Sequence, residues 1–216
     1  MESIFNDIKR GRPILVYEPE EDEFSMMILA NKMNISKMRL MKKYASGDIG
    51  VAISYELASK IKIPFLHELI ISHKKKIPNI KKSSLSLLID HVKAKTGSSD
   101  KDKLLLIKEI ASAAKSKNYE KFAKNIYIPG HLKFFIAAKG LLDSRQGHTE
   151  LNVALARLSG LKPYEIAIVM CSLRNPKNGK MITKKDLNKF ADLKKLPIID
   201  RDVILRYWRE EYGQYS

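Results

Sequence analysis

The sequence predicts one α/β domain in which strands and helices are mixed along the chain. Three observations lead to this prediction. Short β-branched apolar runs, typical of buried strands, alternate irregularly with segments of helical period. The 216 residues contain no fixed-period repeat and no linker. Their 44% hydrophobic content is ample for a core, so we expect a single domain over residues 1–216.

The N-terminal part is expected to form a helix, two strands and a second helix. Gly11 stops the first helix, and Ser36 is the expected N-cap of the second. The first apolar run is short and ends at Pro19, as a buried strand would. In order, these elements are a helix over 3–10, strands over 14–19 and 26–30, and a helix over 37–44.

The middle of the chain continues the alternation. Residues 73–82 hold five lysines and a proline and are expected to form a loop. Residues 104–116 carry an apolar stripe with helical spacing. The other expected elements are strands over 51–55 and 84–92, a loop over 95–103, a short helix over 119–128 running into a strand, and a turn at Pro129-Gly130.

The last third is expected to complete the domain. Leu151, Ala154, Leu155 and Leu158 share one helical face, and Gly160 is a suitable C-cap for that helix. The expected elements are a helix over 149–160, a strand over 164–173, an exposed basic turn over 174–180, a helix from Thr183 to Leu193, a strand over 197–200 and a helix over 203–213.

Composition excludes several classes of protein. A lone cysteine, Cys171, rules out an intramolecular disulfide and a cysteine-rich metal site, which favours a reducing compartment. No run approaches the roughly 20 apolar residues of a membrane helix, and the N-terminus lacks the apolar core of a secretory signal. We therefore expect a cytoplasmic protein with no membrane partner.

Charge is the strongest compositional signal. Forty Lys and Arg against 24 Asp and Glu give a net charge of +16. Such an excess attracts polyanions, either nucleic acid or an anionic membrane surface. The alternative to a polyanionic partner is a protein surface that is rich in lysine because the host cytoplasm favours such surfaces. The lysines are also dispersed along the chain rather than gathered in one segment. Composition alone leaves both readings open.

The segment RQGHTE (145–150) is the strongest candidate site. It lies where a loop enters a predicted helix, and backbone N–H groups at a helix start favour anions. Arg145 adds positive charge, so the segment suits a phosphate, and the His148 ring is free to ligate a metal. The alternative is that His148 or Thr149 simply caps the helix.

For three other features, an ordinary structural role is the alternative to a functional one. The acidic run 18–23 suits Mg²⁺ but is more typical of a solvated loop. The hydroxyl-rich segment 83–97 contains His91, and a strand histidine is usually structural. Cys171 lies in an apolar strand and is expected to be a buried small hydrophobe. The sequence has no Walker A loop and no GxGxxG, GxSxG or HExxH motif.

Taken together, the segments resemble the 3,4-dihydroxy-2-butanone 4-phosphate synthase family of riboflavin biosynthesis. RQGHTELNVALARLSGLKP (145–163) resembles the family's RxGHTE block and the helix that follows it. The other matching segments, in chain order, are GRPILVYEPEEDE, KYASGDIGVAIS, KSSLSLLIDHVKAKTG and IPGHLKFFIAAKGLL. The match runs from about Gly11 to Trp208.

The resemblance implies one α+β domain with a mixed β-sheet flanked by helices, paired as a homodimer. It implies conversion of ribulose 5-phosphate into 3,4-dihydroxy-2-butanone 4-phosphate and formate with Mg²⁺. The family's metal bridges a Glu of the acidic loop and the His of GHTE, which correspond here to Glu23 and His148. Proton carriers and a metal that polarises a carbonyl suit such chemistry.

Several positions depart from the family's pattern. Asp22 stands at the family's arginine, Ser25 and Met26 at two acid positions, and Gly50 at the reactive cysteine. The DRxxT phosphate grip aligns with Asp102, Lys103 and Leu106, and a late catalytic Glu aligns near Val169. From these departures we expect no catalytic residues, with Glu23 and His148 as family-equivalent positions, and we expect an anion site made by Arg145, Thr149, Lys103 and Ser84.

Three functions are weighed on this basis. The first is a non-catalytic homologue that binds structured RNA or the ribosome without a cofactor. Its expected RNA contacts are Lys74, Lys75, Lys76, Lys81, Lys82, Arg174, Lys177 and Lys180. The second is an active, Mg²⁺-dependent synthase of riboflavin biosynthesis. The third is a metabolic regulator that binds a sugar phosphate or a partner synthase.

Overall fold

The fold is built on one seven-stranded sheet with the order β4-β5-β3-β6-β2-β1-β7. The computed structural model describes residues 1–20, 22–45, 48–72 and 82–213. The strands are β1 Ile14–Glu18, β2 Glu23–Leu29, β3 Gly50–Ile53, β4 Leu85–His91, β5 Ile126–Ile136, β6 Ala167–Ser172 and β7 Ile198–Asp200. β3 runs parallel to β5 and β1 parallel to β7, while the other neighbours are antiparallel. The sheet is therefore mixed, as predicted.

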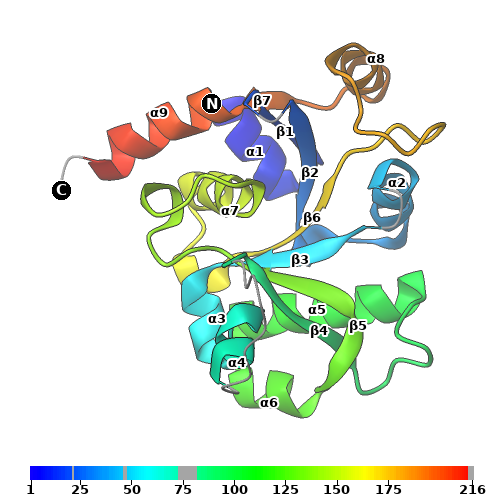
Figure 1. Cartoon of the computed structure of the whole chain (residues 1–216), viewed down its shortest axis with the longest axis vertical. Helices are drawn as coiled ribbons and strands as arrows, with labels where there is room; N and C mark the ends of the chain where they lie inside the picture. The colour runs from blue at the N-terminus through cyan, green and yellow to red at the C-terminus, as the bar shows by residue number, and fades with distance from the viewer. Residues whose placement is uncertain (21, 46–47, 73–81, 214–216) are drawn as a thin grey trace.

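Helices cover both faces of this sheet (Figure 1). They are α1 Glu2–Arg10, α2 Ile35–Ala45, α3 Tyr55–Ile61, α4 Leu66–Ser72, α5 Asp100–Ser116, α6 Tyr119–Lys124, α7 His148–Leu158, α8 Lys184–Lys194 and α9 Arg201–Tyr212. Strand alternation sends successive side chains to opposite faces. Phe24, Met26 and Ile28 pack in the layer of α2 and α5, whereas Met27 and Leu29 pack in the layer of α1, α7 and α9. The single-domain α/β prediction is confirmed.

Local structure differs from the prediction at several points. Asn34, not Ser36, caps α2, because its side chain accepts the N–H of Lys37. α5 begins earlier than expected, with Ser99 as its cap. Pro129-Gly130 lies inside β5 rather than in a turn, where Gly130 lies against the Asp90 backbone and a Cβ would not fit. The helices α3 and α4 were not predicted.

None of the described helices is both long enough and apolar enough to cross a bilayer.

Candidate active site

The start of α7 is where the RQGHTE segment lies, as predicted. The N-cap is Gly147, and no side chain caps the helix. The interpretation of His148 or Thr149 as a cap is therefore wrong. Instead, the first turn is buried, with Thr149 7% and Glu150 0% exposed. These polar side chains must find partners inside the protein.

Arg145 and Glu150 form a paired, largely internal contact. Arg145 Nε donates to Glu150 Oε2 at 2.9 Å, and Nη2 donates to Oε1 at 2.6 Å. The backbone N–H of Ala138 also donates to Oε1, at 2.9 Å. This bidentate geometry fixes the guanidinium at the mouth of the loop. The predicted anion-binding Arg145 is therefore held in place by a neighbour in its own motif.

Two of the predicted anion-binding residues meet directly. Thr149 Oγ1 donates to Ser84 Oγ at 3.1 Å, which joins α7 to the segment before β4. Lys103 lies elsewhere, on α5, on the other face of the sheet. Partial burial first, then the Lys42 ammonium, lower the pKa of Lys103, although Asp100 and Asp90 oppose the shift. Within one chain, Arg145, Thr149 and Ser84 therefore lie together at the start of α7. Lys103 lies instead among the charged side chains of Lys42, Asp100 and Asp90.

His148 has a ring nitrogen with no assigned partner. Its Nε2 is buried and forms no hydrogen bond within the described residues. Glu23 begins β2 on the sheet face that carries Ser25 and Met27, the face that α7 covers. The described residues contain no group of three or more His, Cys, Asp or Glu able to hold a metal. Mg²⁺ keeps several waters and is bound through one or two protein carboxylates. Glu23 and His148 would supply one carboxylate and one imidazole, and the metal site that they would form stays a prediction.

Two positions assigned to lost acids lie on the wrong side of the sheet. Met26 and Val169 pack in the layer of α2 and α5, away from His148. Met170, rather than Val169, faces α7 and pairs in register with Gly50 and Met27. Val169 therefore lies on the opposite face of the sheet from α7, because adjacent strand residues point to opposite faces.

Ser25 does face the site. Asn152 Nδ2 donates to Ser25 Oγ at 2.9 Å and to the backbone oxygen of His148 at 2.7 Å. Asn152 is fully buried among apolar neighbours on α7. A buried amide in an apolar helix face was a signal that the sequence analysis missed. Together these contacts tie the start of α7 to β2.

The remaining singled-out residues have structural roles. Burial raises the pKa of Cys171 to about 12, which agrees with its predicted role as a small hydrophobe. His91 Nδ1 accepts the N–H of Lys93, and its Nε2 lies 3.6 Å from Glu109. Asp102 accepts three backbone N–H groups from residues 95–97, and the resulting hydrogen bonds lower its pKa to about 2.

A shallow cavity of about 310 Å³ lies between the acidic run and α7. Its lining consists of Glu18, Glu20, Arg145, Gln146, Gly147 and Arg201. Arg201 was not recognised in the sequence, because it is an ordinary residue at the start of the last helix. It is 9% exposed and pairs with Glu18 and Glu20.

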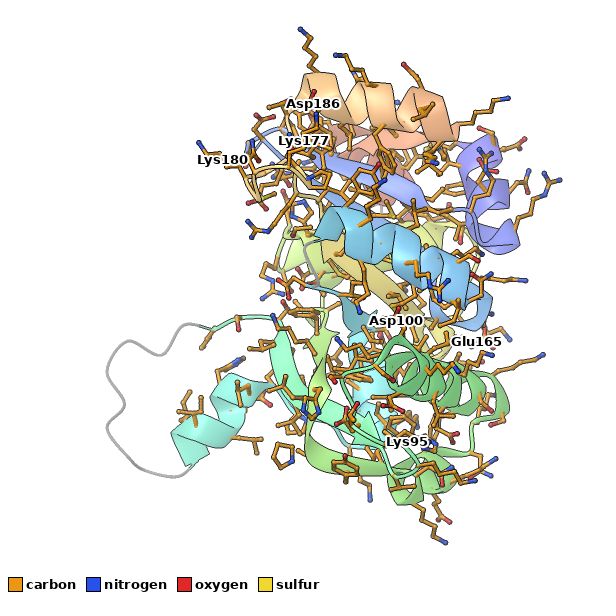
Figure 2. The ribbon with its side chains drawn as sticks, turned by 90° about the vertical axis from the view of Figure 1, so that its right-hand side faces the viewer. Lys95, Asp100, Glu165, Lys177, Lys180 and Asp186 are labelled. Atoms are coloured by element: carbon orange, nitrogen blue, oxygen red, sulfur yellow. The ribbon has the colours of Figure 1, made fainter. Side chains whose placement is uncertain are left out.

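None of the described RNA candidates, which are Lys82, Arg174, Lys177 and Lys180, lines the cavity between the acidic run and α7. Lys74, Lys75, Lys76 and Lys81 lie outside the described residues. Lys82 is exposed. Figure 2 shows Lys177 and Lys180 beside Asp186, which lies on α8. Arg174 donates to the backbone of Gly179 within its own turn.

Relatives of the chain carry the name of an enzyme. This chain is 31% identical to the 3,4-dihydroxy-2-butanone 4-phosphate synthase of Archaeoglobus fulgidus, over 94% of this chain and 91% of that protein. It is 29% identical to the enzyme of the same name from Methanothermobacter thermautotrophicus, over 85% of each. These names overturn the prediction of a non-catalytic RNA- or ribosome-binding protein: neither refers to RNA, and the matches span nearly the whole chain.

Solved structures agree with the relatives. The 3,4-dihydroxy-2-butanone 4-phosphate synthase of Candida albicans superposes with a TM-score of 0.78 at 26% identity, over 95% of each chain. A structure of the synthase with two magnesium ions has the same fold, with a TM-score of 0.79 at 19% identity over 98% of this chain and 97% of the other. The family model of 3,4-dihydroxy-2-butanone 4-phosphate synthase matches residues 2–207. With the whole sheet and the RQGHTE helix start inside that match, this chain belongs to the 3,4-dihydroxy-2-butanone 4-phosphate synthase family.

Proposed function

We propose that this chain is a Mg²⁺-dependent 3,4-dihydroxy-2-butanone 4-phosphate synthase that converts ribulose 5-phosphate and releases formate. One observation supports this reading most directly. The buried Nε2 of His148 has no partner among the described residues, at the start of a helix whose first turn also presents Thr149. An unsatisfied buried nitrogen is costly unless a ligand completes it.

Each residue of the group has a proposed task. Thr149 and Ser84, joined by their hydroxyls, bind the phosphate of the substrate together with the N–H groups of the α7 start. Arg145 adds positive charge and is oriented by Glu150. Glu23 and His148 would hold the metal, which when bound polarises the substrate carbonyl.

Acid and base groups are fewer in this chain than the family resemblance leads one to expect. Ser25, Gly50 and Met170 supply neither a carboxylate nor a thiol on the α7 face. A positioned acid or base contributes typically a factor of 10²–10⁴ in rate. We therefore expect turnover at least about 10²-fold slower than that of the relatives, with substrate binding less affected.

The test is direct. Purified protein is incubated with ribulose 5-phosphate and Mg²⁺, and formate and the four-carbon phosphate are followed by NMR. His148→Ala should abolish turnover. The matched control is His67→Asn, because His67 on α4 also has a buried ring nitrogen without a partner among the described residues and lies outside the cavity near α7. Formate release equal to the blank, or unchanged in His148→Ala, would contradict the proposal.

We also propose that the chain is cytoplasmic and pairs as a homodimer. The edge strand β4, the residue after it and the neighbouring strand β5 present exposed apolar side chains, namely Leu88, Val92, Tyr127 and Ile128. Edge strands with apolar surface favour association. Sedimentation of wild type and of Ile128→Lys tests this pairing, and a wild type that sediments as a monomer would refute it.

A further inference from the structure

Arg201 joins three segments that are distant in the sequence. Its Nη1 lies 2.9 Å from Glu18 Oε1 and 2.6 Å from Glu20 Oε1. Its Nη2 donates to Gln146 Oε1 at 2.6 Å. Glu18 ends β1, Glu20 follows it, and Gln146 lies in the loop before α7. One guanidinium therefore spans the acidic run and the RQGHTE segment.

The position of this arginine is unfavourable unless these contacts offset it. Arg201 is the first residue of α9, and a cation at a helix N-terminus opposes the helix dipole. It is also 9% exposed, so its charge is largely removed from water. Two carboxylates compensate for both costs. The helix itself does not favour an arginine at this position. The contacts of Arg201 with Glu18, Glu20 and Gln146, which we call the Arg201 bridge, account for it.

The bridge lies between the two halves of the proposed metal site. Glu18 is opposite Glu23 in the β1–β2 register, and Gln146 is two residues before His148. Fixing Glu18 and Gln146 to one rigid, planar group sets how the end of the β1–β2 hairpin lies against the start of α7. Glu23 and His148 depend on that arrangement, because each is attached to one of the two segments.

We propose that Arg201 is a positioning residue, which holds the acidic turn against the loop before α7 and so sets the relative placement of Glu23 and His148. The proposal deepens the proposed function and rests on it for its consequence in catalysis. The bridge itself is independent of any activity.

The test compares Arg201→Met, Arg201→Lys and Gln146→Ala with wild type. Gln146→Ala leaves both ion pairs of Arg201 intact and cuts only its bond to the loop, so it serves if Arg201→Met fails to fold. Arg206→Met is the matched control, because Arg206 is an exposed arginine on the same helix. Hydrogen exchange of peptides covering 144–150 measures the bridge, and steady-state kinetics with ribulose 5-phosphate measures its consequence.

In Arg201→Met and Gln146→Ala we expect exchange over 144–150 at least about tenfold faster. We expect kcat to fall by up to about 10²-fold with KM nearly unchanged, because misplacement by about 1 Å has effects of this size. Arg201→Lys should recover part of the loss, and Arg206→Met should match wild type in both measurements.

The outcomes separate the two proposals. Unchanged exchange in Arg201→Met and Gln146→Ala overturns the bridge, whatever the activity. Faster exchange with unchanged kcat overturns the positioning role. If wild type has no turnover, the proposed function fails, and the exchange data alone decide whether Arg201 holds the two segments together.

Discussion

The Arg145–Glu150 pair predicts unequal costs for removing its two members. Arg145→Met leaves the Glu150 carboxylate, 0% exposed, with the Ala138 N–H as its remaining donor among the described residues. Removing one partner of a buried ion pair costs about 3–5 kcal/mol of unfolding free energy. Glu150→Gln instead leaves Arg145, whose side chain is 35% exposed and regains water. It should cost about 1.5–3 kcal/mol, the range for charge-assisted hydrogen bonds.

Urea unfolding of the two variants measures these costs, provided that the slope m is unchanged. Lys133→Met is the control. It removes a surface ion pair to Asp48, whose side chains are 43% and 55% exposed, and such pairs contribute about 0–1 kcal/mol. Equal costs for Arg145→Met and Glu150→Gln, or the reverse order, would show that the contact is not governed by desolvation of the carboxylate.

Three further predictions concern other buried groups. Hydrogen bonds from the Thr96 and Lys95 N–H groups hold the pKa of Asp102 at about 2, below its ordinary value, so the carboxylate stabilises the fold above about pH 4 and this contribution is lost as pH falls from about 4 to 2. The stability difference between wild type and Asp102→Asn, followed by denaturation across pH, should shrink over that range, and a pH-independent difference would contradict this. Cys171, with its pKa raised to about 12 by burial, should not react with a thiol reagent at pH 8 until the protein unfolds, and rapid labelling of the native protein would be evidence against its burial. A Cβ at Gly50 would lie 2.3 Å from Phe135 Cε2, so Gly50→Cys should destabilise by about 1–3 kcal/mol and Phe135→Leu should relieve part of that cost in the double variant; additive effects in thermal melts would argue that the two residues do not clash.

Local sequence signals were enough for much of the fold. β1, α1, α7 and α8 appear where apolar periodicity and caps predict them, and Thr183 caps α8 through the N–H of Asp186. These features depend on neighbours within a few residues, which a sequence displays directly. The α7 start was predicted as a site for the same reason, since Gly147 and His148 mark a loop that enters a helix.

Net charge was a poor guide to function. It sums over the entire surface and describes attraction to polyanions in general, so it cannot select a partner. The described RNA candidates show why: Lys177 and Lys180 lie in a turn beside Asp186 of α8 and do not line the cavity at the start of α7. The relatives of the chain, matched along nearly its whole length, identify the family that composition did not.

Sequence by itself determined most of the elements, the mixed-sheet domain and the location of the RQGHTE segment at a helix start, but not α3 and α4. Only the tertiary structure decided which side chains share a face, as with Met170 in place of Val169, and which distant residues meet. Arg201 contacts Glu18 across 183 positions. Such contacts arise when the sheet and helices pack, and no local pattern encodes them, because a strand register shifted by one residue, or a helix turned about its axis, leaves the same letters with different neighbours.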